Sequence, residues 1–152
     1  FPLRAQEPEF YTFLLREAAA VREHAYAPYS GYRVGAAAAS STGAVFRGAN
    51  MENAVYGLGV CAEVGVLTAA TAGGRLADLR ALALVGDSPG GTEGENVIVP
   101  CGRCRQLIME TAQLADNDIE VIGASPDLKR VRFYTITELL PEAFGAQFLA
   151  NR

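Results

Sequence analysis

The sequence has little of what most metal and redox sites use: it contains one histidine, His24, and three cysteines among 152 residues. The cysteines are Cys61, Cys101 and Cys104. An odd number of cysteines cannot form a fully paired disulfide framework of the kind found in small secreted domains. The N-terminal residues also lack the apolar run of a secretory signal. We therefore expect free or metal-bound thiols in a reducing cytoplasm.

Other absences narrow the class of partner. No apolar run approaches the roughly 20 residues that a membrane-spanning helix needs, so no membrane association is expected. The 13 basic and 17 acidic residues give a net charge of −4, and no basic stripe stands out. Because contacts between basic residues and phosphates drive binding to nucleic acids, this balance disfavours a nucleic-acid partner. With membranes and nucleic acids disfavoured, we expect the partner to be a small molecule.

What the sequence does have is a globular composition, with 50% hydrophobic and 20% charged residues. Its length suits one domain over residues 1–152, and no internal repeat or long linker divides it. The patterns predict helices at 9–25, 61–74 and 101–114, helical turns within 137–150, a hairpin over 32–51, strands at 79–87, 97–99, 119–123 and 131–136, and a loop at 88–96. This order predicts an α/β fold of three α/β/α layers with one mixed, about five-stranded sheet.

Cys101 and Cys104 form a Cys-x-x-Cys pair after Pro100, at the expected start of a helix. Three interpretations are open. A thioredoxin-like redox pair also lies at a helix start, where the helix dipole lowers the thiol pKa, but it leaves Cys61 without a role. The three cysteines can also be small buried hydrophobic residues. The third interpretation is a metal site with three sulfur ligands.

The segment around Cys61 supports the third interpretation. Cys61 also opens an expected helix, and Glu63 follows two residues later. Zinc prefers four ligands in a tetrahedron, so three cysteines leave one position open, as in catalytic zinc sites. A carboxylate beside that position can take a proton from a bound water, although Glu63 also suits the first turn of a helix electrostatically. Together the two segments favour a catalytic site.

Zinc-dependent nucleobase deaminases have this constellation: a His or Cys followed by x-Glu, and later Pro-Cys-x-x-Cys. Beyond it, the chain resembles the cytidine deaminase family, in its short, one-domain branch with three cysteines at the zinc. The resemblance covers nearly the whole sequence. It is carried by the segments "YAPYSGYRVGAA", "GANMENAVYGLGVCAE", "PCGRCRQLIME" and "ELLPEAFG".

The resemblance implies a hydrolase of pyrimidine salvage that deaminates cytidine or deoxycytidine to uridine or deoxyuridine and ammonia. It implies one Zn²⁺ per chain, held by Cys61, Cys101 and Cys104, with Glu63 as the proton shuttle for a zinc-activated water.

Substrate-binding roles follow from the same resemblance. Asn50 and Glu52 would hydrogen-bond the ribose hydroxyls, which suits an amide that both donates and accepts and a carboxylate that accepts. The backbone N–H of Ala62 would bind the pyrimidine carbonyl. Tyr32 would line the nucleoside pocket, where the family usually has Phe.

Family members of this size are usually homotetramers with shared active sites. By that analogy, Tyr56 and Phe144 would reach into the pockets of neighbouring subunits. Taken alone, each is explained about as well by packing in the core.

Two positions depart from the family pattern. The family commonly has Arg directly after the catalytic Glu, where this chain has Val64, and Ala within the Cys-x-x-Cys pair, where it has Arg103. Zinc with three thiolates carries a net charge of −1, which weakens it as a Lewis acid. We expect the Arg103 guanidinium to offset that charge in place of the Arg that the family has at position 64. The alternative is that Arg103 is only a solvated residue at the start of a helix.

Other functions are weighed against this one. "CAEV" with "PCGRCRQ" also resembles blasticidin-S deaminases, which act on a modified cytosine nucleoside, but that branch lacks the Asn-x-Glu motif. A noncatalytic zinc module has no need of Glu63, and the acidic balance disfavours polynucleotide editing despite Arg103 and Arg105. Neither motif reads the 2′ position, so the sequence does not separate cytidine from deoxycytidine.

Overall fold

The computed structural model of the chain describes residues 8–87 and 96–149. Within them, one five-stranded sheet has the order β2-β1-β3-β4-β5. The strands are β1 (Val34–Ser40), β2 (Val45–Ala49), β3 (Leu79–Gly86), β4 (Glu120–Ala124) and β5 (Val131–Thr135). β3 and β4 run parallel, whereas the other neighbouring strands are antiparallel. The prediction of one mixed sheet is confirmed.

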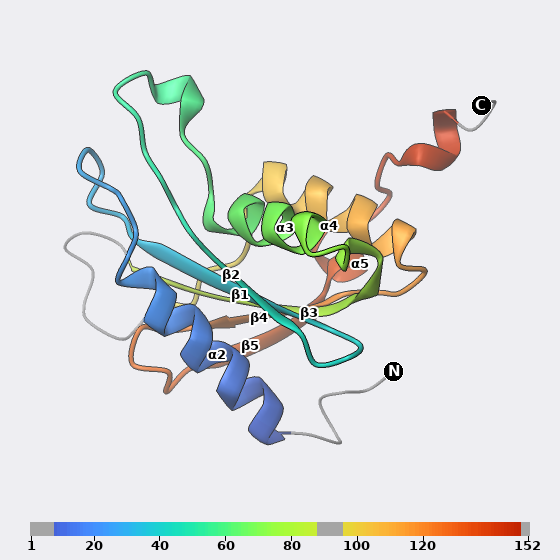
Figure 1. The fold of residues 1–152 in the computed structure, drawn as a ribbon, viewed down its shortest axis with the longest axis horizontal. Coiled ribbons are helices and arrows are strands. Elements are labelled where there is room, and N and C mark those ends of the chain that lie inside the picture. Colours follow the sequence, from blue (N-terminus) through green and yellow to red (C-terminus); the bar gives the residue numbers. More distant parts are fainter. Residues whose placement is uncertain (1–7, 88–95, 150–152) are drawn as a thin grey trace.

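Helices cover both faces of this sheet. They are α2 (Pro8–Arg22), α3 (Ala62–Ala72), α4 (Gly102–Leu114) and α5 (Ile136–Leu139), with 3-10 turns η1 (Tyr56–Leu58), η2 (Leu76–Asp78) and η3 (Ala146–Leu149). α2 lies on one face, and α3 and α4 lie side by side on the other, which gives the three predicted layers (Figure 1). No helix in the described part of the chain is long and apolar enough to cross a membrane.

The central strands are buried on both faces, which explains their nearly continuous apolar sequences. Successive side chains of a strand point to opposite faces. Ala36, Ala38, Leu82 and Leu84 pack against α3 and α4. Ala37, Ala39, Ala81 and Ala83 pack against α2. The alanines of β1 let helices approach both faces of the sheet closely.

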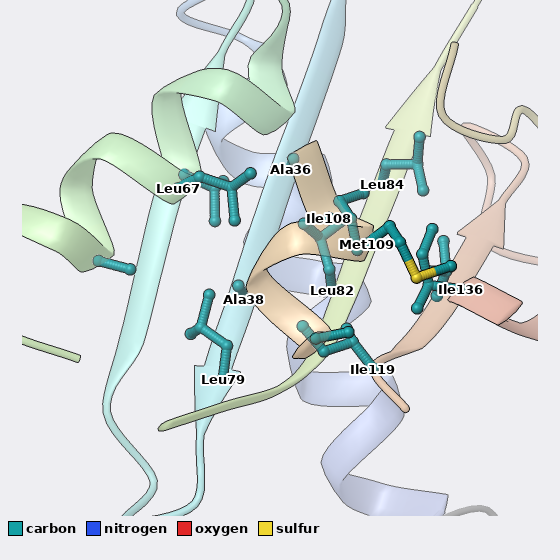
Figure 2. Packing of buried hydrophobic residues seen from close by; sticks show 14 of the residues in the cluster. Ala36, Ala38, Leu67, Leu79, Leu82, Leu84, Ile108, Met109, Ile119 and Ile136 are labelled. Atoms are coloured by element: carbon teal, nitrogen blue, oxygen red, sulfur yellow. The ribbon is translucent and has the colours of Figure 1, made fainter. Parts of the chain in front are cut away.

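The larger core lies under α3 and α4. In Figure 2, Ile108 and Met109 of α4 lie beside Leu82 and Leu84 of β3, and Leu67 of α3 lies on the side of Ala36 of β1. Burying one such side chain contributes about 1.5–3 kcal/mol. This packing fixes the positions of the two helices that begin at the cysteine motifs.

The prediction of a strand at 97–99 is wrong. Residues 96–100 are irregular and belong to none of the described strands. A Cβ on Gly123 of β4 would lie 2.3 Å from the carbonyl oxygen of Ile98, so this segment crosses β4 at a distance that only glycine allows. The short apolar run covers the sheet instead of pairing with it. Residues 88–95 of the predicted loop lie outside the described residues.

Candidate active site

Three cysteine sulfurs converge where α3 and α4 begin. The Sγ atoms of Cys61, Cys101 and Cys104 all lie within 4.8 Å of one another. Cys61 is the N-cap of α3 and Cys101 is the N-cap of α4, while Cys104 lies in the first turn of α4. All three are free thiols. The two motifs, 40 residues apart, are therefore brought together as the sequence predicts.

The arrangement of the sulfurs fits zinc. A tetrahedral ion with Zn–S bonds of about 2.3 Å needs sulfurs about 3.8 Å apart, and the sulfurs of Cys61 and Cys101 are 4.0 Å apart. A redox pair does not explain a third sulfur at this distance. The exposure of Cys101 does not fit three core residues.

The electrostatics of the cluster also favour a cation. Burial, and then the charge of Cys101, raise the pKa of Cys61; burial, and then the Glu63 carboxylate, raise the pKa of Cys104. Three thiolates crowded together repel one another, and a divalent cation removes that repulsion. The N-termini of α3 and α4 both add partial positive charge.

Glu63 lies beside this cluster, in the first turn of α3, and is 5% exposed. Burial raises the pKa of its carboxyl, because a charged group loses its hydration in the interior. A carboxyl with a raised pKa exchanges protons more readily near neutral pH than an ordinary glutamate. This is the property that a proton shuttle needs.

A cavity of about 600 Å³ opens onto the cluster. Cys61, Ala62, Glu63 and Cys101 line one part of it. Ser30, Tyr32, Asn50 and Glu52 supply further polar groups, and Val34, Val60, Val97, Ile98 and Val99 supply apolar walls. Apolar walls with a few convergent polar groups are typical of a small-molecule site.

Asn50 is held by the backbone of the segment leading into β1. Its Oδ1 accepts a hydrogen bond from the N–H of Val34 at 2.9 Å, and its Nδ2 donates to the carbonyl oxygen of Tyr32 at 2.8 Å. The amide retains one further hydrogen and one lone pair for a ligand. Asn50 thus orients the backbone on either side of Arg33 as well as facing the cavity.

Glu52 is the second polar residue at this part of the cavity. Its Oε1 accepts hydrogen bonds from the N–H groups of Tyr29 at 3.0 Å and Ser30 at 3.1 Å. Hydrogen bonds from the side chain and backbone of Ser30, together with that from Tyr29, hold the pKa of Glu52 below its ordinary value. Glu52 is therefore ionised at neutral pH and can accept from ligand hydroxyls.

Tyr32 also lines the cavity. Burial, followed by the nearby Asp87 carboxylate, raises the pKa of its phenol, so the hydroxyl stays protonated at neutral pH. Tyr32 can therefore offer this cavity an O–H group that the Phe usual in the family cannot.

Besides Cys104, which is fully buried behind the cavity lining, three predicted residues do not line this cavity in the described chain. Tyr56 is 80% exposed on the segment between β2 and α3, which projects from the body (Figure 1), and it contacts Tyr29 edge to face. Phe144 is 58% exposed and stacks on Phe148. Arg103 is exposed and, among the described residues, forms no ion pair.

Val97, Ile98 and Val99 line the cavity although sequence reasoning assigned them only to a strand. Their place directly before Pro100 and Cys101 was the available signal, since the chain must pass the metal ligands there. Three apolar residues in a row give the same pattern for a strand and for a cavity wall.

The family described as "Cytidine and deoxycytidylate deaminase zinc-binding region" matches residues 8–115. The match includes Cys61, Cys101 and Cys104, which form the sulfur cluster, and Glu63, which lies beside it.

Individual relatives agree with the family match. The cytidine deaminase of Halalkalibacterium halodurans is 42% identical over 134 residues, which cover 88% of this chain and 93% of that protein. The cytidine deaminase of Mycobacterium tuberculosis is 44% identical over 80% of this chain and 79% of its own length. The crystal structure of cytidine deaminase from Burkholderia pseudomallei superposes with a TM-score of 0.76 at 43% identity, covering 88% of this chain and 98% of that one.

Proposed function

The chain belongs to the cytidine and deoxycytidylate deaminase family, and we propose that it deaminates cytidine and deoxycytidine by hydrolysis. One observation carries the proposal: the buried Glu63 lies beside three convergent cysteine sulfurs, and Glu63, Cys61 and Cys101 line a cavity of about 600 Å³. The thiols supply a three-ligand metal site, and the carboxyl supplies the proton transfer that hydrolysis of an amidine needs.

Cys61, Cys101 and Cys104 would hold the zinc ion, since their three sulfurs supply a closely spaced donor set. When bound, zinc supplies Lewis acidity, which lowers the pKa of a water in the open fourth position toward neutrality. The N-caps of α3 and α4 and the first turn of α4 carry these ligands, and the core under both helices fixes their positions.

Glu63 would move the protons of the reaction. It takes a proton from the attacking water as the new C–O bond forms at C4 of the cytosine ring, and it delivers that proton to N3. It then takes the remaining proton from the new C4 hydroxyl and gives it to the amino group; the C4–N bond breaks, the C4 carbonyl forms, and ammonia leaves. The backbone N–H of Ala62, at the N-terminus of α3, would bind the ring carbonyl, where the helix dipole favours a partial negative charge.

Asn50 and Glu52 would bind the ribose hydroxyls, and Tyr32 would contact the base or sugar from the same cavity. The charged side chains of the described lining are both carboxylates, Glu52 and Glu63, and this lining includes no Lys or Arg. A 5′-phosphate would find no cation there, which favours nucleosides over deoxycytidylate.

Arg103 would offset the negative charge of a zinc held by three thiolates, since Val64 cannot. Its exposed position in the first turn of α4 leaves its side chain free to approach the thiolates. Unchanged zinc affinity and unchanged kcat in the Arg103→Ala variant would contradict this role.

We propose further that the chain is one domain and acts as a cytoplasmic homotetramer with shared active sites, in which Tyr56 and Phe144 reach neighbouring cavities. Exposed apolar side chains support an association: Val55, Tyr56, Leu58, Phe144 and Phe148 are each at least 58% exposed. The three free cysteines suit a reducing compartment.

The direct test is the loss of cytidine absorbance in the ultraviolet, measured on protein whose zinc content is counted. We expect conversion of cytidine and deoxycytidine to their uracil forms, and slow or undetectable conversion of deoxycytidylate. Conversion of blasticidin S without conversion of cytidine would favour the modified-nucleoside alternative. Zinc-loaded protein that converts none of these substrates would contradict the proposal.

A further inference from the structure

A glycine in β2 lets the backbone of this strand touch the backbone of α3. A Cβ added at Gly48 would lie 2.4 Å from the carbonyl oxygen of Ala62 and 2.7 Å from the backbone nitrogen of Val66. Both atoms belong to the helix backbone, so no side chain can rotate away to make room. Any larger residue at position 48 must push the start of α3 away from the sheet.

The residue of α3 that faces Gly48 is also a glycine, Gly65, but there is more space for a side chain at this position. A Cβ added at Gly65 of α3 would lie 3.4 Å from the Cα of Gly48, which is ordinary van der Waals contact. The separation of helix and strand is therefore sensitive to a side chain at position 48 and tolerant of a methyl group at position 65.

This contact lies between the two groups of residues that line the cavity. Gly48 precedes Asn50 by two residues and Glu52 by four, while Ala62 stands between Cys61 and Glu63. The distance between β2 and α3 thus sets the distance between the polar pair at 50 and 52 and the carboxyl beside the thiols.

The strand side of the contact is firmly held. β2 pairs with β1 along its length, and Gly48 lies opposite Ala36 in that register. After the strand, Met51 and Val60 exchange two backbone hydrogen bonds of 2.9 Å, and the N–H of Tyr26 donates to the carbonyl of Asn50 at 3.0 Å. An added methyl at position 48 therefore displaces the start of α3 more readily than the strand.

We propose that Gly48 is a positioning residue that sets the span between Asn50 and Glu52, just after β2, and Cys61 and Glu63, at the start of α3. A nucleoside must contact both groups at once, so this span matches the length from the sugar hydroxyls to the reacting carbon of the base. The proposal rests on the proposed function for its kinetic consequence. Its structural consequence, the displacement of Cys61 relative to Cys101, does not depend on turnover.

The experiment compares Gly48→Ala with Gly65→Ala, its matched control. In Gly48→Ala we expect a cooperative thermal transition, one metal per chain, and a fall in kcat/KM of about a hundredfold, the scale of a misplacement of about 1 Å. The absorption spectrum of the cobalt(II)-substituted variant should change, because Cys61 moves. Gly65→Ala should resemble the parent in every measurement.

A double-mutant cycle with Glu52→Gln separates positioning from general damage. If the span is set by Gly48, the loss caused by Glu52→Gln should be smaller in the Gly48→Ala background than in the parent. Full additivity together with an unchanged cobalt spectrum would overturn the proposal.

Gly65→Leu provides a second route if Gly48→Ala does not fold. The larger side chain presses on the same contact from the helix side, and we expect the same kinetic and cobalt signatures. Parent-like kinetics and an unchanged cobalt spectrum in Gly65→Leu would overturn the proposal. If the parent protein failed to deaminate cytidine, the proposed function would be contradicted. The cobalt(II) spectra of the parent and its variants could still be compared.

Discussion

At the scale of residues, the two acidic groups of the cavity have opposite environments. Glu63 is 5% exposed and burial raises its pKa. Glu52 accepts backbone hydrogen bonds from Tyr29 and Ser30, and its pKa is lowered. A group that carries protons benefits from the first environment, and a group that must stay charged to accept hydrogen bonds benefits from the second.

The role of Glu63 predicts the behaviour of Glu63→Gln. The amide keeps the size of the side chain but cannot take a proton, so kcat should fall by about 10²–10⁴-fold. The three thiols are unchanged, so zinc content per chain should stay the same. Steady-state kinetics and metal analysis on one preparation check both statements, and turnover near the parent rate would rule out the shuttle.

The hydrogen bonds of Glu52 predict its titration. Because its pKa is lowered in the folded state, the carboxylate contributes stability above its ordinary value of 4.5, and this contribution is lost as pH falls through the lowered pKa. The carboxyl carbon resonance of Glu52, followed by NMR, should therefore have a midpoint below 4.5. A midpoint at or above 4.5 would mean that Tyr29 and Ser30 do not donate hydrogen bonds to the Glu52 carboxylate in solution.

At the scale of elements, a buried hydrogen bond of long sequence range links α2 to the sheet. The hydroxyl of Tyr11 donates to Oε2 of Glu120 at 2.5 Å, across 109 residues of sequence, and both side chains are buried. This contact lies under α2, on the face of the sheet opposite α3 and α4. It stabilises the fold without touching the cysteine cluster.

Tyr11→Phe should therefore reduce stability and spare activity. Removing one donor from a buried carboxylate costs about 1–3 kcal/mol of unfolding free energy. Urea denaturation measures that loss, and kcat/KM for cytidine at a temperature where both proteins are folded should be unchanged. A large fall in kcat/KM without a loss of stability would show that the two faces of the sheet are coupled.

The elements differ in how far the sequence could predict them. The hairpin and the two helices that begin at the cysteine motifs were predictable. Their signals, which are hydrophobic periodicity and the positions of Gly and Pro, lie within the elements themselves or directly beside them. The segment at 97–99 was not, since its position depends on Gly123, which follows it by more than twenty residues and permits a close crossing. The convergence of Cys61 with Cys101 and Cys104 could be predicted, because zinc needs several ligands close together. The hydrogen bonds of Asn50 with Val34 and Tyr32 could not be predicted, because they depend on the folded path of the backbone.

At the scale of the whole molecule, exposed apolar side chains gather on two segments. One is the projection between β2 and α3, with Val55, Tyr56 and Leu58, and the other is the C-terminal segment, with Phe144, Phe148 and Leu149. The two segments project at opposite ends of the molecule in Figure 1. In the proposed tetramer, Tyr56 and Phe144 of one subunit would therefore meet different neighbours.

Sedimentation analysis should give a mass about four times the 16.1 kDa of one chain. Because Tyr56 would complete a neighbour's cavity, Tyr56→Ala should lower kcat/KM while leaving zinc content unchanged. A fully active monomer would contradict the shared site, and so would a tetramer whose kinetics do not respond to Tyr56→Ala.

The most direct test of the central claim is a zinc titration of activity. The protein is stripped with a chelator, zinc is returned in measured steps, and cytidine turnover is followed at each step. We expect negligible turnover without metal and a linear rise that ends at one zinc per chain, with no recovery in Cys101→Ala at the same zinc concentrations. Undiminished turnover by the stripped protein, or full recovery in Cys101→Ala, would contradict the account.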